Sequence, residues 1–377
     1  MNSQTDQPCF SQNISRNPLF DVIKAVMMLW VVWGHFSRWG VVAGPLEPAP
    51  YMANVKIAVN MPVFFIIGGY LALSTFQSGS WAKIFARVVG FLWSMASFGL
   101  VFALVLLSYR GWQGWRWLVC FPVKQVLYGH WFLRTFAAIY LLSAIVYSLF
   151  KTDGRRSIAF SILYIILLFW PTRLRGVLFW LGRAPTIHML PFFVAGLLLF
   201  RRFPLWKFSR TALFCTLFFL AIVLLVPDFD SSGLNFWKAS VHWRTVFSSG
   251  WNMAALACRL ALGLSGAVTV LWCVDRFLCR FPQLSVFSTF GTATLGVYVL
   301  HEWPLIEIGK ASVPYLPLPC WTRWPLAIIW FLICHFIIVG IRKVHALRLF
   351  FFGDELMLRR VLEQVFVFRN NVNSLTQ

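Results

Sequence analysis

The first apolar stretch of the chain, residues 19–37, carries an ammonium and an imidazole on one helical face. Lys24 and His35 are eleven residues apart, which on a helix is about 20° from three full turns and about 16 Å along the axis. Ionisable groups are costly inside a bilayer, so each one is a candidate for function. Asp21, one turn before Lys24, can pair with it. The two groups could mark the ends of one polar path, in which a neutral imidazole accepts a proton near pH 7.

A second group of polar residues lies late in the chain. Tyr298 precedes His301 and Glu302 by three and four residues, so the three side chains gather on one side of a helix, where Glu302 is a carboxylate neighbour for His301. Lys83 and Arg87, again one turn apart, form a basic pair at a helix start, and such a pair suits an anionic phosphate group.

The same residues also have purely structural interpretations. Lys24 is compatible with an interfacial lysine that extends its ammonium to water, and His35 with a helix-end histidine bonded to a loop carbonyl. Lys83 and Arg87 are equally typical of anchors on the inner side of a membrane.

The remaining polar positions favour structural roles. The segment Gly129–Arg134, which contains His130, is typical of an interfacial anchor, and His188 and His335 are typical of packed histidines. Gly68 and Gly69 indicate close helix packing. No pair of Cys or His residues has the spacing of a metal site, so we expect no metal.

The elements that must position these residues are membrane-spanning helices. Hydrophobic residues make up 59% of the 377 residues and charged residues only 12%, whereas a soluble domain is about one quarter charged. We expect an all-α, polytopic transmembrane bundle with about ten spans. Their predicted bounds are 19–37, 55–76, 84–107, 131–150, 157–171, 187–200, 211–227, 253–274, 286–304 and 324–341.

The basic residues indicate orientation rather than nucleic-acid binding. The net charge is +21, but Lys and Arg occur in small groups between apolar runs, which is how a membrane protein sets its topology. The excess favours inner segments, so we expect both termini in the cytoplasm. We also expect contacts with anionic lipids and an anionic cosubstrate, and no nucleic acid.

Three segments are expected along the chain. Residues 1–18 form a polar cytoplasmic segment, with no cleavable signal peptide visible; residues 19–341 form the transmembrane domain; and residues 342–377 form a basic cytoplasmic tail with a short amphipathic stretch near Leu347–Phe351. Cys120 and Cys320 are expected in loops on the same outer side, where a disulfide bridge is one option.

Four motifs in order resemble the acyltransferase-3 family of integral-membrane O-acyltransferases, over about residues 16–341. The first is a basic residue, ten residues and a His, here Lys24 to His35. The others are Pro62–Tyr70 (PVFFIIGGY), Trp131–Leu133 (WFL) and Leu295–His301 (LGVYVLH). Two positions depart from the family pattern: Lys24 replaces Arg and lacks its planar fork, and Gly68 replaces a Ser hydroxyl.

The resemblance implies transfer of an acyl group, usually acetyl from cytoplasmic acetyl-CoA, to a sugar hydroxyl of a cell-surface glycan or its lipid-linked precursor. It implies O-acetylation of a polysaccharide by a multi-pass protein of the bacterial inner membrane. On this interpretation His35 is the base or a transient acyl carrier. Tyr298 and His301 orient the acceptor or the base, and Lys24, Lys83 and Arg87 attract the polyanionic donor.

Two other functions remain open from the sequence. A secondary transporter would have an inverted repeat and broken spans in matching halves, and the sequence contains no evident repeat and few intramembrane carboxylates. A non-catalytic membrane partner that keeps the acyltransferase fold is consistent with the changes at Lys24 and Gly68. Absence of CoA-dependent transfer or hydrolysis would favour that partner.

Overall fold

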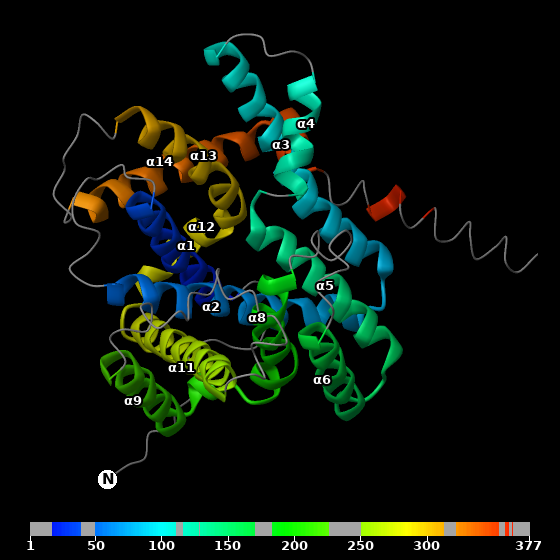
Figure 1. Ribbon diagram of the computed structural model, residues 1–377, viewed down its shortest axis with the longest axis vertical. Coiled ribbons are helices and arrows are strands. Elements are labelled where there is room, and N and C mark those ends of the chain that lie inside the picture. The colour runs from blue at the N-terminus through cyan, green and yellow to red at the C-terminus, as the bar shows by residue number, and fades with distance from the viewer. Residues whose placement is uncertain are drawn as a thin grey trace, which may run out of the picture.

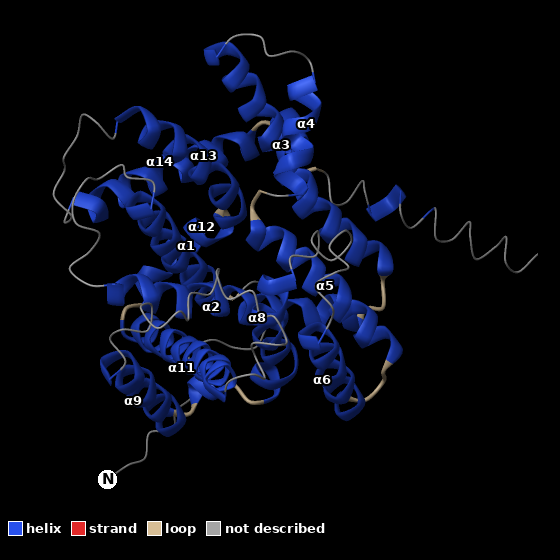
Figure 2. Cartoon of the chain, viewed as in Figure 1, coloured by secondary structure: helices blue, strands red, loops and turns tan. Residues whose placement is uncertain are grey.

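The computed structural model describes residues 17–38, 50–110, 116–127, 129–169, 183–225, 250–312, 322–353, 359–361 and 364. Within these ranges every regular element is a helix and no strand occurs (Figure 2). Most of two predicted segments lies outside the described residues, namely residues 1–16 of the N-terminal segment 1–18 and most of the tail 342–377. Cys320 also lies outside them.

The described helices occur in a fixed order along the chain. They are α1 (Pro18–Arg38), α2 (Pro50–Gln77), α3 (Trp81–Arg110), α4 (Arg116–Leu127), α5 (Trp131–Leu149), α6 (Asp153–Phe169), α8 (Arg183–Val194), the π-helix η1 (Ala195–Phe200), the 3₁₀-helix η2 (Leu205–Lys207), α9 (Ser209–Leu225), α11 (Gly250–Arg280), the 3₁₀-helix η3 (Pro282–Phe287), α12 (Ser288–Thr292), α13 (Thr294–Ser312), α14 (Arg323–Lys343) and α15 (His345–Phe352).

Six of the described helices are long and apolar enough to cross a bilayer: 18–36, 59–77, 81–108, 131–149, 259–280 and 324–343. A seventh span is formed if 282–292 and 294–302, which are bent by 56° at their junction, cross together. The predicted spans 187–200 and 211–227 correspond to shorter apolar helices, and 157–171 to the 17-residue α6. The count of ten spans and the orientation of the termini stay predictions.

One helix was missed by the sequence analysis. Cys120 was expected in a loop, but it lies on α4, which packs along α3 (Figure 1). Residues 118–127 form a short apolar helix, and such a stretch near a bilayer forms a helix because unpaired backbone groups are costly there. Cys120 is an exposed free thiol.

Helix α2 lies at the centre and contacts α1, α5, α8, α11 and η1 (Figure 1). The crossing with α8 and η1 depends on two glycines. A Cβ on Gly69 would collide with the carbonyl oxygen of Phe193, and one on Gly196 with that of Ile66. The two backbones therefore touch directly, which confirms the close packing expected for Gly69.

The predicted amphipathic stretch near Leu347–Phe351 is the helix α15, and it is docked on α3. The indole of Trp93 donates to the carbonyl of Phe350 at 2.8 Å, and the hydroxyl of Ser97 donates to that of Phe351 at 3.0 Å. The ring of Phe351 is buried, with its centroid 4.5 Å from that of Phe98. α15 therefore closes one side of the bundle.

Candidate active site

Two histidines from distant helices meet beside one carboxylate. His35 lies near the end of α1 and His301 on α13, and their ring centroids are 4.9 Å apart in an edge-on arrangement. The Nδ1 atom of His35 lies 3.8 Å from Oε1 of Glu302. The side chain of His35 is 18% exposed, whereas His301 is fully buried. His35 is therefore the more accessible of the two imidazoles.

Glu302 has a second imidazole partner that the sequence analysis assigned to an anchor. The Nδ1 atom of His130 lies 3.6 Å from Oε2 of Glu302. Burial, together with the nearby His301, lowers the pKa of His130 to about 3, so this imidazole is neutral at pH 7. Glu302 thus lies between His35 and His130, with one carboxylate oxygen toward each.

His130 reaches this position through an uncommon backbone conformation. It is the one non-glycine residue in the described part of the chain with positive φ, at 30°. It precedes α5, where the guanidinium of Arg134 donates to the carbonyl oxygen of Leu127 at the end of α4. This hydrogen bond closes the turn between α4 and α5 and so fixes the place of His130. Left-handed residues held in this way are enriched at functional sites.

Hydrogen bonding within α13 sets the proton position on His301. Its Nδ1 lies 3.0 Å from the carbonyl oxygen of Val297, and a carbonyl only accepts, so Nδ1 carries a hydrogen. In the neutral ring Nε2 is then the basic nitrogen. The ring of Tyr298 lies beside it, with centroids 5.8 Å apart, and it also contacts His130 at 5.7 Å. The four side chains form one group, which we call the histidine cluster: His35, His130, His301 and Glu302, with Tyr298 at its edge.

A cavity of about 280 Å³ extends from Tyr298 toward two basic residues, Lys24 and Arg87. The other lining residues are mainly apolar and come from α1, α2, α3, α5 and α13: Met28, Met61, Phe64, Ile67, Gly68, Leu71, Ala72, Phe91, Phe132, Leu133, Phe136, Tyr140, Thr294 and Leu295. We call it the central pocket. Its mainly apolar lining, with Lys24 and Arg87 among it, suits a mostly apolar ligand with a negatively charged end.

The two cations of the central pocket come from different helices. The ammonium of Lys24 pairs with Asp21 at 2.6 Å, as the spacing predicted. Arg87 faces the pocket from α3, whereas Lys83, one turn earlier, does not contribute to the lining. Of the three residues predicted to attract a polyanionic donor, the structure brings two together.

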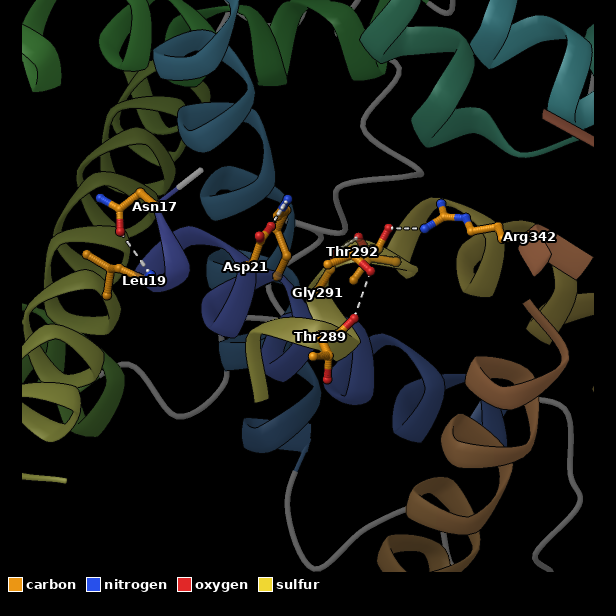
Figure 3. A network of polar contacts seen from close by, with 9 residues as sticks. Asn17, Leu19, Asp21, Thr289, Gly291, Thr292 and Arg342 are labelled. Carbon is orange, nitrogen blue, oxygen red and sulfur yellow. Dashed lines mark hydrogen bonds and ion pairs between the residues drawn. The ribbon is translucent and has the colours of Figure 1, made fainter. Parts of the chain in front are cut away.

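The pocket is also bounded by the break between α12 and α13. A Cβ on Gly291 would collide with the carbonyl oxygen of Asp21, so α12 touches α1 where Lys24 is paired. The guanidinium of Arg342 donates to the carbonyl of Thr292 at 2.7 Å (Figure 3), which satisfies backbone freed by the break. α13 then begins at the edge of the pocket, and the N-terminus of a helix favours negative charge.

Gly68, where the family pattern has Ser, gives room to an aromatic ring. A Cβ at this position would collide with the ring of Phe136. Phe136 packs against Phe65 and Phe132, with ring centroids 5.4 and 6.0 Å away. The missing hydroxyl is therefore replaced by an aromatic wall of the pocket.

His188 and His335 are two of the described histidines that lie outside the cluster and the pocket lining. His188 is buried on α8, with Arg259 of α11 near enough to interact with it electrostatically. His335 packs on α14 against the ring of Phe290, with centroids 4.4 Å apart. Both fit the packed histidines that the sequence predicted.

The centre of the site could be predicted from the sequence, whereas the contacts of Glu302 and His130 could not. The structure brings His35, Tyr298 and His301 together, whereas their predicted roles stay predictions. Glu302 was expected beside His301 but is directed at His35 and His130. The only sequence signal for His130 was its place directly before the Trp131–Leu133 motif.

Comparison with known proteins identifies the family of the chain. The family model of acyltransferase-3, described as an acyltransferase domain, matches residues 17–341. The search of curated proteins and the search of solved structures found no match.

Proposed function

The chain belongs to the acyltransferase-3 family, and from this membership we propose that it is a membrane O-acyltransferase that moves an acetyl group from cytoplasmic acetyl-CoA to a sugar hydroxyl. Membership and the apolar helices make it a multi-pass membrane protein of the acyltransferase kind. The acceptor in this proposal is a cell-surface glycan or its lipid-linked precursor, and the membrane is the bacterial inner membrane.

The observation that carries the proposal is the continuity between the central pocket and the histidine cluster. Tyr298 lines the pocket and also contacts His130 and His301. The arm of CoA is long and flexible and carries two secondary amides, and the phosphates of CoA would meet Lys24 and Arg87, with Lys83 one turn before Arg87 on α3. A thioester carried to the opposite end of the pocket would lie near His35.

The chemistry needs a base for the hydroxyl and a leaving thiolate. In the proposed step His35 takes the proton of the sugar hydroxyl, and the oxygen of that hydroxyl attacks the carbonyl carbon of the thioester. The carbon–sulfur bond then breaks, and the CoA thiolate leaves and takes the proton from the imidazolium, which gives an O-acetyl sugar and free CoA. Glu302 stabilises the positive charge that develops on His35. His35 as a transient acyl carrier is the other form of the mechanism.

A transporter is a less well supported function. Its marks are broken spans in matching halves, and the part of the chain that the structure describes contains one such bent pair, α12–α13. That break borders the central pocket, so it is equally compatible with an acyltransferase that binds its donor there.

The test is transfer of label from radiolabelled acetyl-CoA in membranes that express the chain, measured in extracted glycans and lipid-linked sugars. We expect label with the wild type and with His188→Ala, a matched buried histidine outside the cluster, and none above background with His35→Ala. Equal label with and without His35 would contradict the mechanism. No label with any well-expressed form would point to another donor, a transporter or a non-catalytic partner.

A further inference from the structure

Asn60 of α2 is a buried polar residue that the histidine cluster does not use. It is 1% exposed, and neither its amide oxygen nor its amide nitrogen has a hydrogen-bond partner among the described residues. Buried amide groups are nearly always paired, because an unpaired one costs stability. Such a group, with both a donor and an acceptor open, fits a ligand that the structure does not contain.

The side of α2 that carries Asn60 is the wall of the central pocket. Phe64, Ile67 and Leu71 all line the pocket, and they follow Asn60 by four, seven and eleven residues. These spacings place the three residues within about 40° of Asn60 around the helix. Asn60 therefore continues the pocket wall by one turn beyond Phe64.

The direction of that continuation follows from the contacts between α1 and α2. The rings of Phe20 and Tyr70 are in contact, with centroids 4.9 Å apart, while Met28 and Met61 line the pocket together. The two helices therefore run in opposite directions. Asn60 lies beyond Met61, at the end of the pocket away from the Phe20 contact.

The same register gives the depth of Asn60 relative to His35. Asn60 is ten residues from Tyr70, so its level on α1 is about ten residues after Phe20. His35 is five residues farther along, which is about 8 Å at 1.5 Å per residue. Along the axis of α1, the level of Asn60 thus lies between the pocket residue Met28 and His35.

The open amide matches a chemical group of the proposed donor at this depth. The arm of acetyl-CoA contains secondary amides, and the nearest one is two carbon atoms from the thioester sulfur. A secondary amide has one N–H and one carbonyl, and these are the complements of the oxygen and the nitrogen of Asn60. With the thioester near His35, this amide falls about one to two helical turns deeper in the pocket.

We propose that Asn60 binds the secondary amide of the acyl donor next to the thioester, and thereby selects amide-bearing thioesters. This inference rests on the proposed function. Asn60 would position the donor, and the proton transfer at His35 would be unchanged by it.

The experiment compares two small donors with purified protein. S-Acetyl-N-acetylcysteamine keeps the amide, and its ester counterpart, S-(2-acetoxyethyl) thioacetate, replaces the N–H by oxygen. We expect the wild type to favour the amide donor about tenfold in kcat/KM, which is the size of one buried hydrogen bond. Asn60→Leu should lose this preference. Thr135→Val should keep the preference for the amide donor and serves as the control. Thr135 has a buried hydroxyl on α5 that also lacks a partner among the described residues, but it does not line the pocket.

Thermal unfolding of the same variants separates a binding role from a structural one. Leu fills the site without an unpaired amide, so the unfolding temperature of Asn60→Leu should equal or exceed that of the wild type. A clear fall would show that Asn60 is bonded within the protein and would overturn the inference.

Transfer with an unchanged donor preference in Asn60→Leu would likewise overturn it while leaving the proposed function standing. Absence of transfer from acetyl-CoA and from both small donors by the wild type would overturn the proposed function itself.

Discussion

Replacement of Glu302 by Gln removes a negative charge from between two imidazoles while keeping the size of the side chain. The carboxylate lies 3.8 Å from His35 and 3.6 Å from His130. His130 is neutral at pH 7 because burial lowers its pKa to about 3. The charge of Glu302 therefore acts chiefly on His35 when that imidazole becomes cationic during transfer.

The size of the effect follows from the distance. Two unit charges 3.8 Å apart interact with about 4 kcal/mol at an effective dielectric constant of about 20. The side chain of Glu302 is 22% exposed, so water screens part of this. We expect Glu302→Gln to lower kcat for acetyl transfer by about 10²- to 10³-fold, with little change in KM for acetyl-CoA.

The assay is initial-rate transfer from acetyl-CoA by purified protein, with His35→Ala and the double variant measured in parallel. Residues that act as a unit have non-additive effects. The double variant should therefore be no slower than His35→Ala alone. A Glu302→Gln variant that keeps more than about half of the wild-type rate would contradict this role of Glu302, as would losses that multiply in the double variant.

Other consequences of the structure concern donor binding, the pocket wall and the docked tail. Arg87→Gln should raise KM for acetyl-CoA about tenfold, whereas Lys83→Gln should change it less than Arg87→Gln does; equal effects would contradict the placement of the pocket. Gly68→Ser should lower stability by about 1–3 kcal/mol because its Cβ overlaps the ring of Phe136, and Phe136→Leu should restore part of the loss in thermal unfolding. Phe351→Ala should expose the C-terminal segment to limited proteolysis before any loss of the bundle, since the α15 contact loses its buried ring; an unchanged cleavage rate would contradict this.

Much of the fold could be predicted from apolar run length alone, because a bilayer leaves few alternatives to a helix. The predicted spans that contain Lys24, His35 and Tyr298 correspond to α1 and to the α12–α13 pair. Two features could not be predicted: α4, whose apolar stretch is too short to span, and the bend between α12 and α13. Neither changes the hydropathy pattern, since both depend on packing against other helices.

Some residues of the candidate site could likewise be predicted from the sequence, and others could not. His35 and His301 could be identified because ionisable residues are conspicuous in apolar runs. The 4.9 Å distance between their ring centroids and the contact of Glu302 with His130 depend on which helices are neighbours in space. The spacing of residues along the sequence does not determine which helices pack together. Asn60 could not be identified from the sequence, because the sequence does not tell whether a buried amide has a hydrogen-bond partner.

The most direct measurement of the central claim is single-turnover transfer of a labelled acetyl group from acetyl-CoA by the purified chain in the presence of extracted glycan. The wild type and His188→Ala should transfer label at similar rates, and His35→Ala should be slower by at least about 10²-fold, the contribution of one general base. Transfer that is intact in purified His35→Ala would contradict the assignment of the chemistry to His35.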